Sequence, residues 1–144
     1  MREEWTEAAT TTHQDHVIAH VIGATVLGYF SLGETVHLLL DIGFLWKIYV
    51  DGEMGLLPHP VATAELEVDD EARAQIKHDI DLLLRGNVEA SRLARLLPIN
   101  VTSPITGVEL QVRGEEYKLV LEGESGTVQI LTSVSDGSIQ VTEV

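Results

Sequence analysis

The sequence contains no cysteine among its 144 residues, and it is poor in basic side chains. The lack of cysteine excludes disulfides, cysteine-ligated zinc, iron–sulfur clusters and thiol catalysis. Only 9 lysines and arginines stand against 23 aspartates and glutamates, which gives a formal charge of −14. Because nucleic acids and anionic lipids bind cationic surfaces, this balance argues against both partners. We therefore expect an acidic, soluble protein that binds neither nucleic acid nor membrane.

The common catalytic and nucleotide-binding motifs are missing as well. The chain has no P-loop, no dinucleotide-binding glycine pattern, no nucleophile elbow and no H-E-x-x-H zinc motif. The first twelve residues contain no apolar run of the kind found in a secretory signal peptide. The apolar segment 17–33 has no basic flank and runs into Glu34, so it is a poor membrane span. These absences favour a cytoplasmic protein without enzymatic activity, and we predict no cofactor.

The longest patterned stretch runs from residue 16 to residue 57. Every second residue from Val36 to Val50 is apolar, and this period of two predicts a strand. The segment 17–30 before it is almost continuously apolar and rich in β-branched residues. We interpret the two segments as one long antiparallel hairpin that turns at residues 31–34. Pairing Phe30 with Thr35 would place the even-numbered residues of the second strand on a core face.

The rest of the chain predicts short elements around this hairpin. Residues 1–12 fit a flexible terminus and a docked helical turn equally well. Short strands are predicted at 53–57 and 61–68, and two helices at 69–86 and 88–97. Four strands separated by glycine-containing turns follow at residues 108–113, 116–122, 127–132 and 138–143.

These elements together predict the fold class. We expect one α+β domain over residues 1–144. It would combine a long N-terminal antiparallel β-hairpin sheet, two central helices and a C-terminal four-strand antiparallel meander.

Three of the six histidines, His13, His16 and His20, are spaced H-x₂-H-x₃-H. On a helix these positions share a face and can hold a metal ion. On a strand, His16 and His20 would lie about 13 Å apart at ~3.3 Å per residue, which is too far for one ion. Because a strand is expected here, we predict no metal site and keep the three histidines only as candidate ligands.

His37 and Asp41 are the candidate catalytic residues. They would share the second face of the predicted strand, about 13 Å apart by the same spacing. A carboxylate within an apolar strand needs a partner, so Asp41 is either solvated, paired with Lys47 or a histidine, or a general acid. His20, Tyr49 and Trp46 are the candidates for contacting a small-molecule ligand.

Two hypotheses of function follow. In the first, the protein is a non-enzymatic binding or interaction domain that self-associates as a homodimer or larger homo-oligomer. The second face of the hairpin is half apolar and needs cover. Its apolar residues are Ile18, Ile22, Val26, Phe30, Leu39 and Leu45. In the second hypothesis, the protein is a small hydrolase- or isomerase-like enzyme with an acid–base or metal site around His20, His37 and Asp41.

Overall fold

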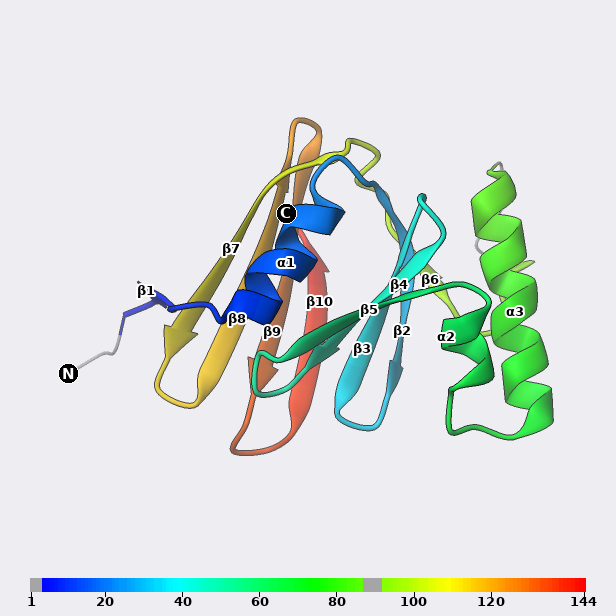
Figure 1. Cartoon of the computed structure of the whole chain (residues 1–144), viewed down its shortest axis with the longest axis horizontal. Helices are drawn as coiled ribbons and strands as arrows, with labels where there is room; N and C mark the ends of the chain where they lie inside the picture. Colours follow the sequence, from blue (N-terminus) through cyan, green and yellow to red (C-terminus); the bar gives the residue numbers. More distant parts are fainter. Residues whose placement is uncertain (1–3, 87–91) are drawn as a thin grey trace.

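The computed structural model describes residues 4–86 and 92–144 (Figure 1). Its strands form two five-stranded antiparallel sheets. Sheet A contains, in spatial order, β1 (Thr6–Glu7), β7 (Ile105–Arg113), β8 (Glu116–Gly123), β9 (Gly126–Ser133) and β10 (Ser138–Glu143). Sheet B contains β5 (Met54–Pro58), β4 (Phe44–Tyr49), β3 (Thr35–Leu40), β2 (Val26–Leu32) and β6 (Leu97–Pro98). The helices are α1 (Thr12–Val21), α2 (Val61–Ala64) and α3 (Asp70–Arg85).

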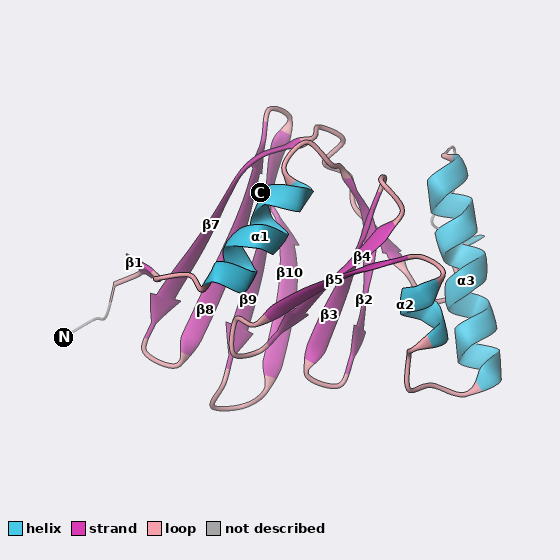
Figure 2. Cartoon of the chain, viewed as in Figure 1, coloured by secondary structure: helices cyan, strands magenta, loops and turns pink. Residues whose placement is uncertain are grey.

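These elements are arranged in three layers, with sheet B in the middle (Figure 2). Sheet A packs on one face of sheet B, whereas α2 and α3 cover the other face. Helix α1 lies beside β5 and contributes Val17 and Val21 to the core between the sheets. Antiparallel sheets with helices on one side make an α+β arrangement, as the sequence predicts at this level.

The core between the sheets confirms the predicted faces of residues 35–50. Even-numbered residues of β3 and β4 point toward sheet A, and odd-numbered residues such as Leu39 and Leu45 point toward the helices. Ile42 is the exception, because it lies exposed in a turn. The largest side chains of sheet B in the shared core are Leu38, Leu40, Trp46 and Ile48, and sheet A contributes Leu110, Leu119, Leu121, Val128 and Ile130.

The predicted long hairpin is wrong in two places. Residues 12–21 are helix α1, and the predicted second strand reverses at residues 41–43 to give β3 and β4. Gly43 has a φ of 81°, which the reversal requires and which glycine adopts without a steric penalty. The β2–β3 loop is also tighter than predicted: Leu32 pairs with Thr35, so Phe30 faces His37. This shift of two residues leaves the faces of Tyr29 and Phe30 unchanged. A bulge between Val26 and Gly28 turns Val26 toward sheet A and Leu27 toward the helices, which is the reverse of the predicted faces.

Helix α1 begins with a capping box that competes successfully with the β-branched residues following it. Gln14 N donates to Thr11 Oγ1 at 3.1 Å, and Thr11 N donates to Gln14 Oε1 at 2.9 Å. The Gln14 side chain also donates to Gly52 O at 2.8 Å, which fixes the helix to the turn after β4. The T-x-x-Q pattern is visible in the sequence, but the apolar run favours a strand.

Elsewhere the predictions are partly confirmed. Helix α3 is capped by Asp69 and ends at Gly86, β5 lies near the predicted strand 53–57, and β7 to β10 correspond to the four C-terminal strands. Residues 61–68 form α2 and a connection instead of a strand, and β1 takes the place of a helical turn. The predicted helix 88–97 is wrong for residues 93–97, and its first part lies outside the described residues. Within those residues, no helix has both the length and the apolar character needed to cross a membrane.

Candidate functional site

A pocket of about 420 Å³ opens on the helix-covered side of sheet B, and we call it the His37 pocket. His37 on β3 and Lys47 on β4 are directly paired in the sheet and both line it. The connection between α2 and α3 forms the opposite side, and the β2–β3 hairpin closes one end. The remaining lining residues are Leu32, Gly33, Thr35, Glu65, Leu66 and Glu67.

His37 is buried, with 3% of its surface exposed. Its ring stacks on Phe30, with the centroids 4.7 Å apart and the planes 3° apart. Burial and, to a smaller extent, the positive charge of Lys47 together lower the pKa of His37 to about 4. The imidazole is therefore neutral at pH 7 and carries a single N–H group.

The two ring nitrogens of His37 differ in their surroundings. Nδ1 is enclosed by protein and has no hydrogen-bond partner. A buried donor without an acceptor is rarer than a buried acceptor without a donor. We therefore assign the proton to Nε2, which leaves only a lone pair at the enclosed Nδ1. The N–H group is then at Nε2, the ring nitrogen that protein does not enclose.

Lys47 supplies the positive charge of the His37 pocket. It is half-buried, and the ion pairs of the described residues do not include it. The two carboxylates that line the pocket, Glu65 and Glu67, are exposed on the connection after α2. The pocket thus has a cation and a neutral imidazole on its sheet side and two acidic groups on its loop side.

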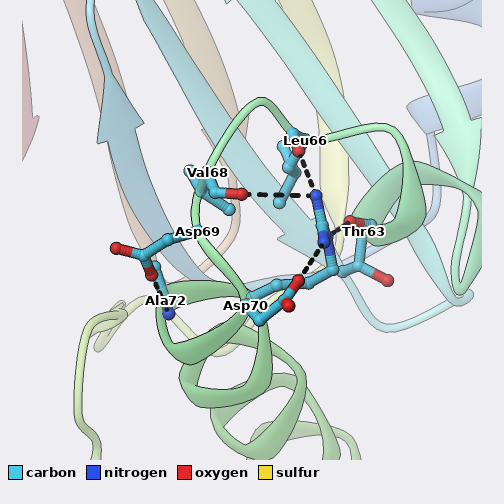
Figure 3. A network of polar contacts seen from close by, with 7 residues as sticks. Thr63, Leu66, Val68, Asp69, Asp70 and Ala72 are labelled. Atoms are coloured by element: carbon cyan, nitrogen blue, oxygen red, sulfur yellow. Dashed lines mark hydrogen bonds and ion pairs between the residues drawn. The ribbon is translucent and has the colours of Figure 1, made fainter.

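Arg73 on α3 holds the loop side in place through the carbonyls of Thr63, Leu66 and Val68, which are labelled in Figure 3. Its guanidinium donates to the backbone oxygens of Thr63 at 3.2 Å, Leu66 at 2.7 Å and Val68 at 3.4 Å. Three carbonyls on one planar donor group fix the path of residues 63–68. Because Glu65 and Glu67 lie within this path, their backbone positions are set before any ligand arrives.

Asp41 is exposed in the turn between β3 and β4, away from His37. Its backbone N donates to Thr25 O, and its Oδ1 accepts from Thr25 N, both at 2.9 Å. The carboxylate therefore connects the turn to the residue before β2. His20 lies on α1 and lines a different pocket from His37. The structure does not assemble His20, His37 and Asp41 into one acid–base site.

The three histidines of the H-x₂-H-x₃-H pattern lie on α1, so the predicted strand, and with it the spacing of about 13 Å between His16 and His20, is wrong. His13, His16 and His20 all line a pocket of about 250 Å³ together with Phe44 and Leu56. His13 Nε2 donates to Met54 O at 2.9 Å and so connects α1 to β5. Over residues 4–86 and 92–144, no group of three or more histidines and carboxylates is close enough to hold a metal ion.

Trp46 and Tyr49, the other ligand-binding candidates, do not line the His37 pocket. Trp46 is completely buried between the two sheets, and Tyr49 is exposed at the end of β4. Sequence reasoning missed Lys47 as a site residue. The segment Asp41-Ile42-Gly43 could have revealed it, because these residues are typical of a turn. A turn at this position places Lys47 opposite His37 in the sheet.

Comparison with protein-family models, with curated proteins and with solved structures found no match.

Proposed function

We propose that this protein is a non-enzymatic binding domain that holds a small organic anion in the His37 pocket. The observation that carries the proposal is the pairing of a neutral, buried His37 with Lys47, whose ammonium is in no ion pair of the described residues. Directly paired residues of neighbouring strands have Cβ atoms about 5 Å apart. An N–H donor and an ammonium at this spacing suit the oxygens of one carboxylate.

The remaining lining residues suit an organic ligand of limited size. The pocket volume of about 420 Å³ falls within the range of roughly 300–1,000 Å³ that is typical of small-molecule sites. Leu32 and Leu66 offer apolar surface for the hydrocarbon part of a ligand. Partial exclusion of water strengthens the attraction between Lys47 and an acidic group.

Glu65 and Glu67 narrow the class of ligand further. Two carboxylates at the loop side repel a ligand with several negative charges, and they attract an ammonium group. A zwitterion with a carboxylate at one end and an amine at the other satisfies both sides of the pocket. We therefore propose ω-amino acids and related zwitterions as the ligand class.

The properties of His37 favour binding over catalysis. A general base works best when its pKa lies near the working pH, and burial lowers the pKa of His37 to about 4. None of the hydrogen bonds within residues 4–86 and 92–144 orients the His37 ring through a carboxylate. Both points support a role for His37 as a hydrogen-bond donor to a bound ligand.

The cytoplasmic location predicted from the sequence stays a prediction.

Ligand titration followed by NMR tests this proposal. We expect the ring resonances of His37 to shift on addition of an ω-amino acid, and to shift less with a plain carboxylate of equal length. Lys47→Met should weaken binding by about tenfold or more, equivalent to ~1.4 kcal/mol. Lys77→Met, which changes an exposed lysine on α3, is the matched control and should leave binding unchanged.

The double variant Glu65→Gln/Glu67→Gln tests the amine end of the ligand separately from the carboxylate end. This double variant should weaken binding of the amino acid and should strengthen binding of the plain carboxylate, because two repelling charges are removed. Absence of any shift of His37 across carboxylates, amines and amino acids would refute the proposed function. Binding that Lys47→Met does not alter would place the ligand elsewhere.

A further inference from the structure

The apolar face that led us to predict self-association is covered within one chain. Phe30, Leu39 and Leu45 pack under α2 and α3, and Val26 belongs to the core between the sheets. Any association between copies must therefore use another surface. The edges of the two sheets are the alternative, because unpaired edge strands invite pairing with another chain.

Three of the four sheet edges are short or covered. At the β5 edge, the side chains of His13 and Gln14 donate to Met54 O and Gly52 O. At the β2 edge, β6 adds a two-residue strand. At the β7 edge, β1 pairs with two residues, and further along it Ala8 N donates to Leu110 O and Gly23 N to Ile105 O. None of these edges offers a long free ladder.

Strand β10 differs, because it pairs only with β9 among the described residues. Thr127 and Val144, at the end of this ladder, donate to each other's oxygens at 3.1 and 2.8 Å. Since hydrogen-bonded and non-hydrogen-bonded pairs alternate, residues 138, 140 and 142 direct their backbone groups to β9. The backbone groups of Ile139 and Val141 therefore point outward.

The composition of β10 leaves this edge unprotected. Its six residues, Ser-Ile-Gln-Val-Thr-Glu, include no proline and no lysine, and its pairing with β9 shows no bulge. These are the devices by which edge strands usually avoid association. Among the described residues, the segment at Asn100 and Val101 contacts β10 through Glu143, whose carboxylate accepts from Asn100 N and Val101 N. The stretch around Gln140 is open.

We propose that two copies of the chain pair antiparallel through β10 and join their five-stranded sheets A into one sheet of ten strands. Outward-facing residues must pair with outward-facing residues, and a two-fold axis placed at Gln140 sets Ile139 opposite the partner's Val141 and Gln140 opposite the partner's Gln140. Ser138 then faces the partner's Thr142. No like charges stand opposite each other in this register, and the two-fold symmetry closes the assembly as a dimer.

The net charge adds a second expectation. Each copy carries a formal charge of −14, so two copies repel each other over long distances. Added salt screens this repulsion. Association through β10 should therefore strengthen with ionic strength, the reverse of what a salt-bridged interface shows.

Cross-linking of single cysteines gives a direct test, because the chain has none of its own. Gln140 is exposed, and in the proposed register its Cα would lie about 4.5 Å from the partner's. This spacing allows a disulfide. Mild oxidation of Gln140→Cys should therefore give a covalent dimer. Thr142→Cys is the matched control, since its two copies would lie about 13 Å apart and should stay unlinked.

Val141→Pro tests the ladder itself. Its N–H points outward, so proline keeps the bonds to β9 and removes a bond to the partner. We expect the wild type to sediment as a dimer at micromolar concentration, and a Val141→Pro variant with wild-type circular dichroism to sediment as a monomer. A monomeric wild type would overturn the proposal. Equal cross-linking of the two cysteine variants, or a dimeric Val141→Pro, would overturn it as well. Ligand binding in the His37 pocket involves none of these residues.

Discussion

Phe30 and His37 lie opposite each other on β2 and β3, with their rings nearly parallel and 4.7 Å apart at the centroids. The stack places the imidazole between an aromatic ring on one neighbouring strand and Lys47 on the other. Both neighbours disfavour the imidazolium form, one by excluding water and one by its charge. The sheet register thus keeps His37 neutral, which is the state that the proposed binding role requires.

His37 should make the stability of the protein depend on pH. Its pKa falls from 6.5 to about 4 on folding, so the unfolded chain takes up the proton first. The free energy of unfolding therefore rises with pH between about 4 and 6.5, by ~3 kcal/mol in total. Above pH 6.5 the contribution of His37 no longer changes. Urea denaturation at pH 4.5 and pH 7 should show a smaller difference for His37→Leu than for the wild type.

The control for this measurement is His16→Gln, which replaces an exposed histidine on α1. It should retain the pH difference of the wild type. An unchanged pH difference in His37→Leu would mean that His37 does not stay neutral in the folded protein.

Arg73 should matter both for stability and for ligand binding. Arg73→Met leaves the carbonyls of Thr63, Leu66 and Val68 without their donor, and we expect a loss of ~2 kcal/mol in the free energy of unfolding. Because the same residues position Glu65 and Glu67, affinity for a zwitterionic ligand should also fall. Calorimetry on the folded variant would measure the second effect.

Asp70→Asn separates the carbonyl bonds of Arg73 from its ion pair. The Asp70 carboxylate lies 3.2 Å from Arg73 Nη1 and is fully exposed, so water screens the pair. This variant should behave like the wild type in stability and in binding. If Asp70→Asn were as damaging as Arg73→Met, the carbonyl bonds would not be the source of the effect.

The faces of the sheet could be predicted from the sequence, whereas the positions of its turns could not. Alternation of apolar residues records which side of a sheet each residue faces. The reversal at residues 41–43 pairs even with even positions, for example Leu38 with Trp46, so the alternation continues through it unchanged. One long strand and two short ones therefore give the same pattern. The β-branched residues of α1 led to the wrong prediction of a strand for a different reason. In this segment, helix capping and packing outweigh the strand propensity of these residues.

The His37 pocket was beyond prediction for two physical reasons. His37 was a candidate, but its neighbour Lys47 follows only from the strand register. The loop side is held by hydrogen bonds from Arg73 to backbone carbonyls. Every residue has such a carbonyl, so the sequence does not show which ones Arg73 binds. The segment 61–68 also alternates like a strand, which concealed the connection that carries Glu65 and Glu67.

Asp79 should be essential for the position of α3. It is fully buried and accepts from the backbone N–H groups of Ala94, Arg95 and Leu96 at 2.9, 2.6 and 2.9 Å. Burial alone raises the pKa of Asp79, but these bonds and one from His78 outweigh it and keep the pKa below its ordinary value. The stabilisation is therefore present above pH 3.8 and is lost as the pH falls through the lower pKa of the folded state.

The test variant is Asp79→Ala, which leaves three backbone donors, one of them on the buried Leu96, without their acceptor and should lower the free energy of unfolding by ~2 kcal/mol or more. Asp81→Ala on the same helix is exposed and should change it little. Chemical denaturation at pH 7 compares the two. Similar losses in both variants would show that helix charge, and not the three bonds, explains the effect.

Trp5 should determine whether the β7 edge stays closed. Two cations of sheet A lie over its ring, with the Arg113 guanidinium 4.4 Å and the Lys118 ammonium 4.5 Å from the ring centroid. These contacts hold β1, a strand of only two residues, against β7. Trp5→Ala should cost ~1 kcal/mol or less and should accelerate hydrogen exchange at Ala8 N, which donates to Leu110 O. Trp5→Phe keeps an aromatic face and should retain most of the protection. An exchange rate unaffected by Trp5→Ala would mean that the ladder to β7 holds β1 without the ring.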